Sequence, residues 1–88
     1  MQKYFFLFMS DSRDKEEILH TFAETLRRYR PQKGLTQLDL AVAVGLDLRQ
    51  IKRYEAATST ATIVYVCRIA DALDVSAGDL LTNPTNDM

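Results

Sequence analysis

Three basic residues, Arg49, Lys52 and Arg53, lie within one short polar segment of the chain. Arg49 and Arg53 are four residues apart, which puts both guanidinium groups on one face if the segment is helical. A guanidinium group can donate two hydrogen bonds to guanine O6 and N7, and each such pair contributes about 1–3 kcal/mol of base discrimination. Lys52 carries a compact charge that suits a phosphate. The segment therefore indicates contact with a nucleic acid, although the same side chains would also suit a helix that only faces water.

The basic segment follows two helix caps and a turn. Asp47 can cap a helix that holds Gln50 in the reciprocal place, and Thr36 with Asp39 makes the same pattern earlier in the chain. Gly45 lies between the caps, where the chain must end one helix and turn sharply, and such a position favours a residue that tolerates positive φ. Two short helices joined by a turn that contains glycine are typical of a helix-turn-helix.

The residues at fixed spacing across this segment are Thr36, Gln37, Leu40, Ala41, Gly45, Ile51 and Glu55. They match the pattern Thr-Gln-x-x-Leu-Ala-x-x-x-Gly, followed by a recognition helix with a central Ile and a terminal Glu. On these residues the chain resembles the DNA-binding domain of the Cro and phage-repressor (XRE) family. The resemblance covers about residues 26–81 and implies an all-α, five-helix lambda-repressor-like domain, here with an N-terminal apolar arm.

In helix-turn-helix proteins the second helix enters the major groove with its early residues at base edges. We therefore expect base contacts from Leu48, Arg49 and Arg53, with Leu48 against a thymine methyl group or a sugar. The family's Gln at the start of the preceding helix binds a backbone phosphate, and the resemblance gives that role to Gln37. Lys52 is the second expected phosphate contact.

The resemblance also implies a structural ion pair between Arg30 and Glu55. In the phage repressors, the matching residues tie the first helix to the end of the recognition helix. Leu38 and Val42, in contrast, depart from the family pattern, because they lie on an outer face that is normally polar. They predict an exposed apolar strip unless another segment covers it.

Residues 1–12 form an apolar arm and cap ahead of the domain, and the apolar run consists of Tyr4, Phe5, Phe6, Leu7, Phe8 and Met9. The run is shorter than the about 20 residues that span a bilayer, so no membrane contact is expected. It could pack on its own domain, cross to another protomer, or be dispensable if translation starts at Met9. Our hypothesis is that it covers the strip of Leu38 and Val42, in cis or from a partner.

Residues 13–81 are predicted to form the domain, and residues 82–88 a flexible tail. Ser10, Asp11 and Ser12 are candidate caps for a first helix, which should end near Arg30 because Pro31 disfavours a helical residue before it. The apolar stripe of this helix is Ile18, Leu19, Phe22, Leu26 and Tyr29. Later spacing predicts a helix over residues 63–73, capped by Thr62 and with Ile63 on its apolar face, and a short helix after a capping box of Ser76 and Asp79.

Charge is unevenly spread along the 88 residues, whose formal net charge is -1. Residues 27–53 hold seven basic and two acidic residues, a sum of +5, whereas residues 1–26 sum to -2 and residues 54–88 to -4. A basic middle between acidic ends is what a DNA-facing surface on a near-neutral protein would produce, although ordinary surface patterning explains it equally well.

The chain has one cysteine, Cys67, and one histidine, His20. A single cysteine allows no intrachain disulfide, which favours a reducing cytoplasm, and apolar neighbours predict that the Cys67 thiol is buried. Neither a zinc site nor a catalytic triad can be assembled from this set. We therefore expect no metal, no cofactor and no enzymatic activity.

One domain of this size offers few base contacts, so we expect a homodimer that reads two half-sites of double-stranded DNA about 34 Å apart. The dimer contact is expected from Val75, Leu80 and Leu81, with the arm as the rival element. These features predict a sequence-specific transcriptional regulator, most simply a repressor. The alternative is an antitoxin or other protein-binding module that docks a partner through residues 4–8 and uses the same domain for autoregulation.

Overall fold

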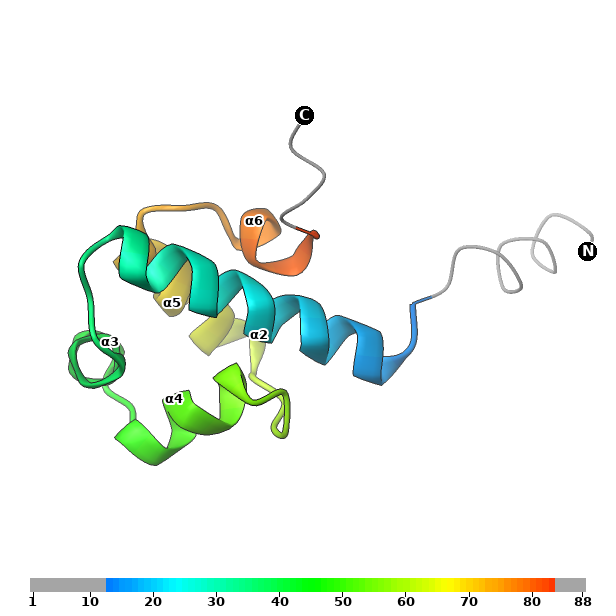
Figure 1. Cartoon of the computed structure of the whole chain (residues 1–88), viewed down its shortest axis with the longest axis horizontal. Helices are drawn as coiled ribbons and strands as arrows, with labels where there is room; N and C mark the ends of the chain where they lie inside the picture. The colour runs from blue at the N-terminus through cyan, green and yellow to red at the C-terminus, as the bar shows by residue number, and fades with distance from the viewer. Residues whose placement is uncertain (1–12, 84–88) are drawn as a thin grey trace, which may run out of the picture.

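The computed structural model describes residues 13–83. In this part of the chain five α-helices and no strand follow one another (Figure 1), which confirms the all-α, five-helix prediction. They are α2 (Lys15–Gln32), α3 (Gln37–Val44), α4 (Leu48–Glu55), α5 (Ile63–Leu73) and α6 (Ala77–Leu81). None of these helices has the length and apolar character that crossing a membrane requires. The predicted arm and cap at residues 1–12, and the tail from residue 84 onward, lie outside the described residues.

Helix α2 begins at a different cap from the one predicted. Asp14 is the N-cap, and its side chain accepts a hydrogen bond from the backbone N–H of Glu17 at 2.9 Å. The cap predicted among residues 10–12 is therefore wrong. Glu16 and Glu17 lie in the first turn, where acidic side chains stabilise the positive end of the helix dipole.

Helix α2 also continues beyond Arg30, through Pro31 to Gln32, so its predicted end is too early. Pro31 has no N–H and removes one backbone hydrogen bond from the last turn. The turn nevertheless closes, because the N–H of Lys33 donates to the carbonyl oxygens of Tyr29 and Arg30 at 3.1 and 3.2 Å.

The core forms between all five helices, because α2 packs against α4 and α6, and α3 packs against α4 and α5. Its buried members are Phe22, Leu26, Leu40, Ala41, Val44, Ile51, Tyr54, Val66, Ile69, Ala70, Leu73 and Leu80. Phe22 and Tyr54 pack edge to face with ring centroids 5.6 Å apart, which joins α2 to α4. The hydroxyl of buried Thr25 lies 2.9 Å from the carbonyl oxygen of Leu80 and ties α2 to α6. Because Leu80 is fully buried in this core, its predicted role in a dimer contact is wrong.

Gly45 ends α3 in the left-handed conformation at φ 76° and ψ 33°. Its N–H donates to the carbonyl of Val42, and the N–H of Leu46 donates to the carbonyl of Ala41 at 2.9 Å. These bonds satisfy carbonyl groups that the end of a helix leaves without partners. The turn between α3 and α4 thus depends on a backbone conformation that glycine adopts without steric cost.

We expect Gly45→Ala to lower the free energy of unfolding by about 1–2 kcal/mol. A Cβ at this position would meet no atom within 4 Å, so the cost is purely conformational. Gly45→Asn is the matched control, because asparagine tolerates the left-handed region better and should cost less. Urea unfolding of the three proteins measures the difference, and an equal cost for Ala and Asn would contradict this reading.

Candidate nucleic-acid interface

The recognition-helix candidate α4 has two different faces. Ile51 and Tyr54 are buried against the core, whereas Arg49, Lys52 and Arg53 are exposed. The Asp47 side chain caps the helix by accepting from the N–H of Arg49 at 3.4 Å. The guanidinium group of Arg49 lies 3.8 Å from the Asp47 carboxylate, but both side chains are largely exposed, so this ion pair contributes little and leaves Arg49 able to reach another partner.

Leu48 is half-buried at the first residue of α4, between the buried face and the basic face. Gln50 does not complete a capping box with Asp47, and that prediction is wrong. Its Nε2 instead donates to Ser59 Oγ at 3.0 Å, which joins α4 to the loop that follows it. The backbone N–H of Thr58 donates to the carbonyl oxygen of Arg53 at 3.0 Å and so satisfies a carbonyl group at the end of α4. In this loop Ala57 adopts φ 61°, the left-handed region that favours glycine or asparagine.

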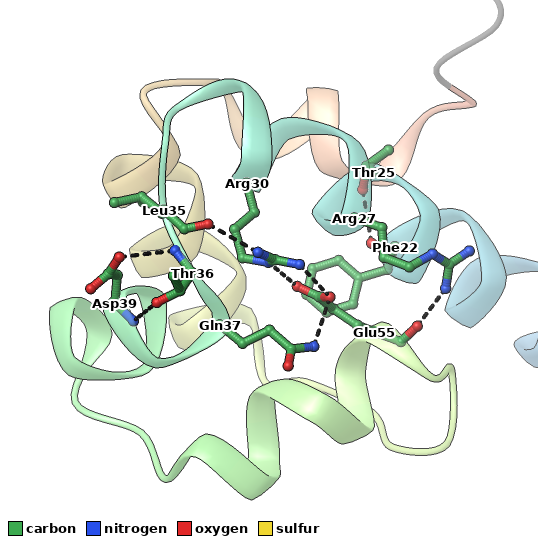
Figure 2. A network of polar contacts seen from close by, with 9 residues as sticks. All are labelled: Phe22, Thr25, Arg27, Arg30, Leu35, Thr36, Gln37, Asp39 and Glu55. Carbon is green, nitrogen blue, oxygen red and sulfur yellow. Dashed lines mark hydrogen bonds and ion pairs between the residues drawn. The ribbon is translucent and has the colours of Figure 1, made fainter.

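The far end of α4 is held by a polar network centred on the Glu55 carboxylate (Figure 2). Arg30 Nε lies 2.6 Å from Glu55 Oε2, and Arg30 Nη2 lies 3.1 Å from Oε1, so the guanidinium group meets both oxygens. Gln37 Nε2 also donates to Oε1 at 3.0 Å. Glu55 is only 5% exposed. One carboxylate therefore joins the ends of α2 and α4 to the start of α3.

Two further bonds complete this network. Arg30 Nη1 donates to the carbonyl oxygen of Leu35 at 2.9 Å, which fixes the connection between α2 and α3. Arg27 Nη1 donates to the backbone carbonyl of Glu55, one of the groups that the end of α4 leaves without a helical partner. Arg30 thus points into the protein, in the ion pair that the resemblance implied, and not toward the exposed face of α4. The contact of Arg27 was not foreseen from the sequence.

Gln37 is the first residue of α3 and is half-buried. The helix begins at a capping box, in which Thr36 Oγ1 accepts from the N–H of Asp39 at 3.0 Å and Asp39 accepts from the N–H of Thr36 at 2.9 Å. The bond from the Thr36 backbone lowers the pKa of Asp39. The stability that this carboxylate contributes is therefore present above its ordinary pKa and is lost as the pH falls through the lowered one.

Four apolar side chains face outward. Leu38 and Val42 on α3 are 55% and 73% exposed, as the sequence predicted for this strip. On α5, Ile63 and Val64 are 78% and 54% exposed, so the placement of Ile63 on the buried face is wrong. Cys67 lies one turn beyond Ile63 and is also exposed, which overturns its predicted burial. The buried face of α5 instead comprises Val66, Ile69, Ala70 and Leu73.

Across residues 13–83, no group of three or more His, Cys, Asp or Glu side chains is arranged to hold a metal ion. In the same residues, every buried side-chain nitrogen or oxygen atom has a hydrogen-bond partner. The buried polar groups of residues 13–83 are thus satisfied within the fold, whereas Arg49, Lys52 and Arg53 remain exposed on α4.

Comparison with known proteins agrees with this geometry. The family model HTH_3, described as helix-turn-helix, matches residues 26–80. The crystal structure of a hypothetical transcription factor, NHTF, from Neisseria superposes with a TM-score of 0.76 at 28% identity, over 86% of this chain and 87% of that one. Among curated protein sequences, none matches the chain significantly.

A second structure is that of the restriction-modification controller protein C.AhdI from Aeromonas hydrophila. It has a TM-score of 0.68 at 34% identity, over 70% of this chain and 94% of that one. The family match spans more than half of the chain and includes α3, α4, the turn between them, all of α5, the last turns of α2 and most of α6. The chain belongs to the HTH_3 helix-turn-helix family.

Proposed function

We propose that this DNA-binding transcriptional regulator is a sequence-specific repressor that binds a two-fold symmetric operator as a dimer. The observation that carries the proposal is the division of α4 into a face buried in the core and an exposed face with Arg49, Lys52 and Arg53. The Glu55 network holds the end of this helix, so the basic face is presented in a fixed orientation. A helix of this kind can lie in the major groove with its first turns at base edges.

In this proposal Arg49 and Arg53 read bases, and half-buried Leu48 contacts a thymine methyl group or sugar at the entry to the groove. Lys52 and Gln37 meet backbone phosphates. The start of α3 suits an anion because its first backbone N–H groups point away from the helix. Gln37 has two amide hydrogens and gives one of them to Glu55 at 3.0 Å. We infer that the bond to Glu55 orients Gln37, so that its second N–H faces a phosphate.

Salt titration of duplex binding separates the two phosphate contacts. We expect Lys52→Ala to reduce the slope of log affinity against log salt concentration by about 1, since one fewer counterion is released. Gln37→Ala should weaken binding without changing that slope, because a neutral amide displaces no counterion. Both losses should be similar on specific and nonspecific duplexes, since phosphate contacts carry no sequence information. Fluorescence anisotropy at several salt concentrations measures these effects, and unchanged binding by both variants would refute the proposed phosphate contacts.

The proposed dimer uses the exposed face of α5. With Leu80 buried, we assign the interface to Ile63 and Val64, two exposed apolar residues that begin α5 after the loop that follows α4. A two-fold interface pairs the same patch of both subunits, so a single apolar patch suffices. Such a contact would place two recognition helices on one side of the dimer, as two half-sites require.

Val64→Glu is expected to convert a dimer into a monomer, because a two-fold interface would bring two unpaired carboxylates together. Val42→Glu is the matched control, since Val42 is also an exposed valine, on α3 instead of α5. Sedimentation equilibrium of the three proteins gives the masses. If Val42→Glu and not Val64→Glu halves the mass, the interface lies on α3 and the assignment to α5 is wrong.

A further inference from the structure

An apolar groove lies beside the first two turns of α2, away from the basic face of α4. Its volume is about 250 Å³, and its walls are Ile18, Leu19 and Phe22 of α2, Val66 of α5 and Leu81 of α6. Lys15 at the start of α2, and Thr60 and Ala61 in the loop between α4 and α5, complete the lining. Ile18 remains 37% exposed at the groove although it belongs to the apolar stripe of α2. The proposed function leaves this groove without a role.

The chain enters the domain at the rim of the groove. The guanidinium Nη1 of Arg13 donates to the carbonyl oxygen of Leu81 at 2.8 Å, and Leu81 is itself a wall residue. Asp14 then caps α2, so both residues that precede the helix are fixed by hydrogen bonds. Lys15, two residues after Arg13, lines the groove, so the segment before Arg13 joins the domain beside it.

We propose that the aromatic segment of residues 4–9 of the same chain binds in this groove. Ser10, Asp11 and Ser12 separate it from Arg13, and three residues span at most about 10 Å. Serine and aspartate favour turns, so this link suits a chain that reverses direction. The segment is composed of aromatic and aliphatic residues, which match walls that are almost wholly hydrocarbon. Removing this apolar surface from water favours docking.

The same geometry argues against the strip of Leu38 and Val42 as the place where the chain's own arm docks. Helix α3 lies near the C-terminal end of α2 (Figure 1), whereas Arg13 precedes its N-terminal end, and the 18 residues of α2 span about 27 Å. The nine residues from Tyr4 to Met9 and Ser10 to Ser12 reach about 30 Å only when fully extended. An arm stretched to that length would end where the strip begins and could not cover it.

A double-mutant cycle on the full chain tests the proposal. The arm variant is Phe5→Ser/Phe6→Ser/Phe8→Ser, which keeps the length and charge of the arm, and the groove variant is Ile18→Ser. We expect the arm variant to lower the thermal midpoint by roughly 4–8 °C. In the arm variant, Ile18→Ser should cost much less than in the unchanged chain, because the two sites contact one another. Val42→Ser is the control and should be additive with the arm variant.

Three results of this mutant cycle would overturn the proposal. The first is additive shifts for Ile18→Ser and the arm variant. The second is coupling of the arm with Val42→Ser instead, which would return the arm to the α3 strip. The third is coupling that grows with protein concentration, which would place the arm on another copy. Nuclear Overhauser effects between phenylalanine rings and the methyl groups of Ile18 or Val66 are expected in the unchanged chain, and their absence would equally contradict docking in the groove.

Discussion

Replacing Arg30 by alanine is expected to lower the free energy of unfolding by about 3–5 kcal/mol, because it leaves the buried Glu55 carboxylate without its cation. The 2.6 Å contact to Oε2 and the 3.1 Å contact to Oε1 would both be lost, and only Gln37 would remain as a side-chain donor. Such a loss is a large part of the 5–15 kcal/mol that stabilises a typical domain. Urea unfolding followed by circular dichroism measures it.

The double mutant makes this test specific to the pair. Glu55→Ala alone should also destabilise, whereas Arg30→Ala/Glu55→Ala should cost much less than the sum of the single changes, because neither charge is then left buried and unpaired. Arg28→Ala is the control, since Arg28 is exposed on the same helix and should change stability by less than about 0.5 kcal/mol. Additive losses would show that Arg30 and Glu55 act independently.

Replacing both Arg49 and Arg53 by alanine should weaken binding to a specific operator by about 30-fold to 10⁴-fold per half-site. This follows from about 1–3 kcal/mol for each bidentate contact to guanine and tenfold for every 1.4 kcal/mol. Nonspecific binding should fall far less, so the ratio of specific to nonspecific affinity collapses. Because both side chains are exposed, the thermal midpoint should hardly change.

Competition gel shifts with operator and scrambled duplexes measure that ratio. Arg28→Ala is the matched control, because Arg28 is an exposed arginine on α2, outside α4 and outside the proposed dimer face of α5. It should leave the ratio unchanged. An equal loss on operator and scrambled DNA for the Arg49/Arg53 variant would mean that these side chains only attract the backbone.

The helices could be predicted from the sequence because their signals are local. Thr36, Gly45 and Asp47 fix the ends of α3 and α4 through caps and a positive φ, which depend on residues within one turn. The helical spacing of the apolar residues in α5 also predicted a helix correctly, although its β-branched residues favour a strand. The predicted ends of α2 were wrong because the local sequence there is compatible with more than one cap and more than one end point. At the N-terminal end, four residues have side chains that can cap a helix, namely Ser10, Asp11, Ser12 and Asp14. At the C-terminal end, Pro31 disfavours a helical residue before it but does not prevent a last helical turn.

The burial of Ile63, Cys67 and Leu80 was predicted wrongly because it depends on how the helices pack against one another. Spacing shows that α5 has an apolar stripe, but Ile63, Val64 and Val66 are all apolar, so the pattern does not show which of them faces the core. For the same reason the sequence predicted that Cys67 is buried, whereas it lies on the exposed face of α5. Leu80 is the anchor of α6 in the core, and a five-residue helix has too few positions for spacing to reveal that.

The residue types of the candidate site could be predicted from the sequence, but the hydrogen bonds between its side chains could not. Arg49, Lys52 and Arg53 lie on the exposed face of α4, where sequence reasoning put them. The bonds of Gln37 and Arg27 to Glu55 depend on how α2 and α3 cross α4, and no spacing along the chain encodes that crossing. The signal that pointed toward this network was the family position of Arg30 and Glu55.

Selection of duplexes from a random-sequence pool, followed by sequencing, tests most directly whether α4 reads DNA. We expect the unchanged protein to enrich two inverted half-sites with centres about 34 Å apart, or one helical turn, and with guanine at fixed positions in each. The Arg49→Ala/Arg53→Ala variant should lose the guanine preference while it still binds duplex DNA. Enrichment of no motif, or of the same motif by both proteins, would contradict base reading by α4.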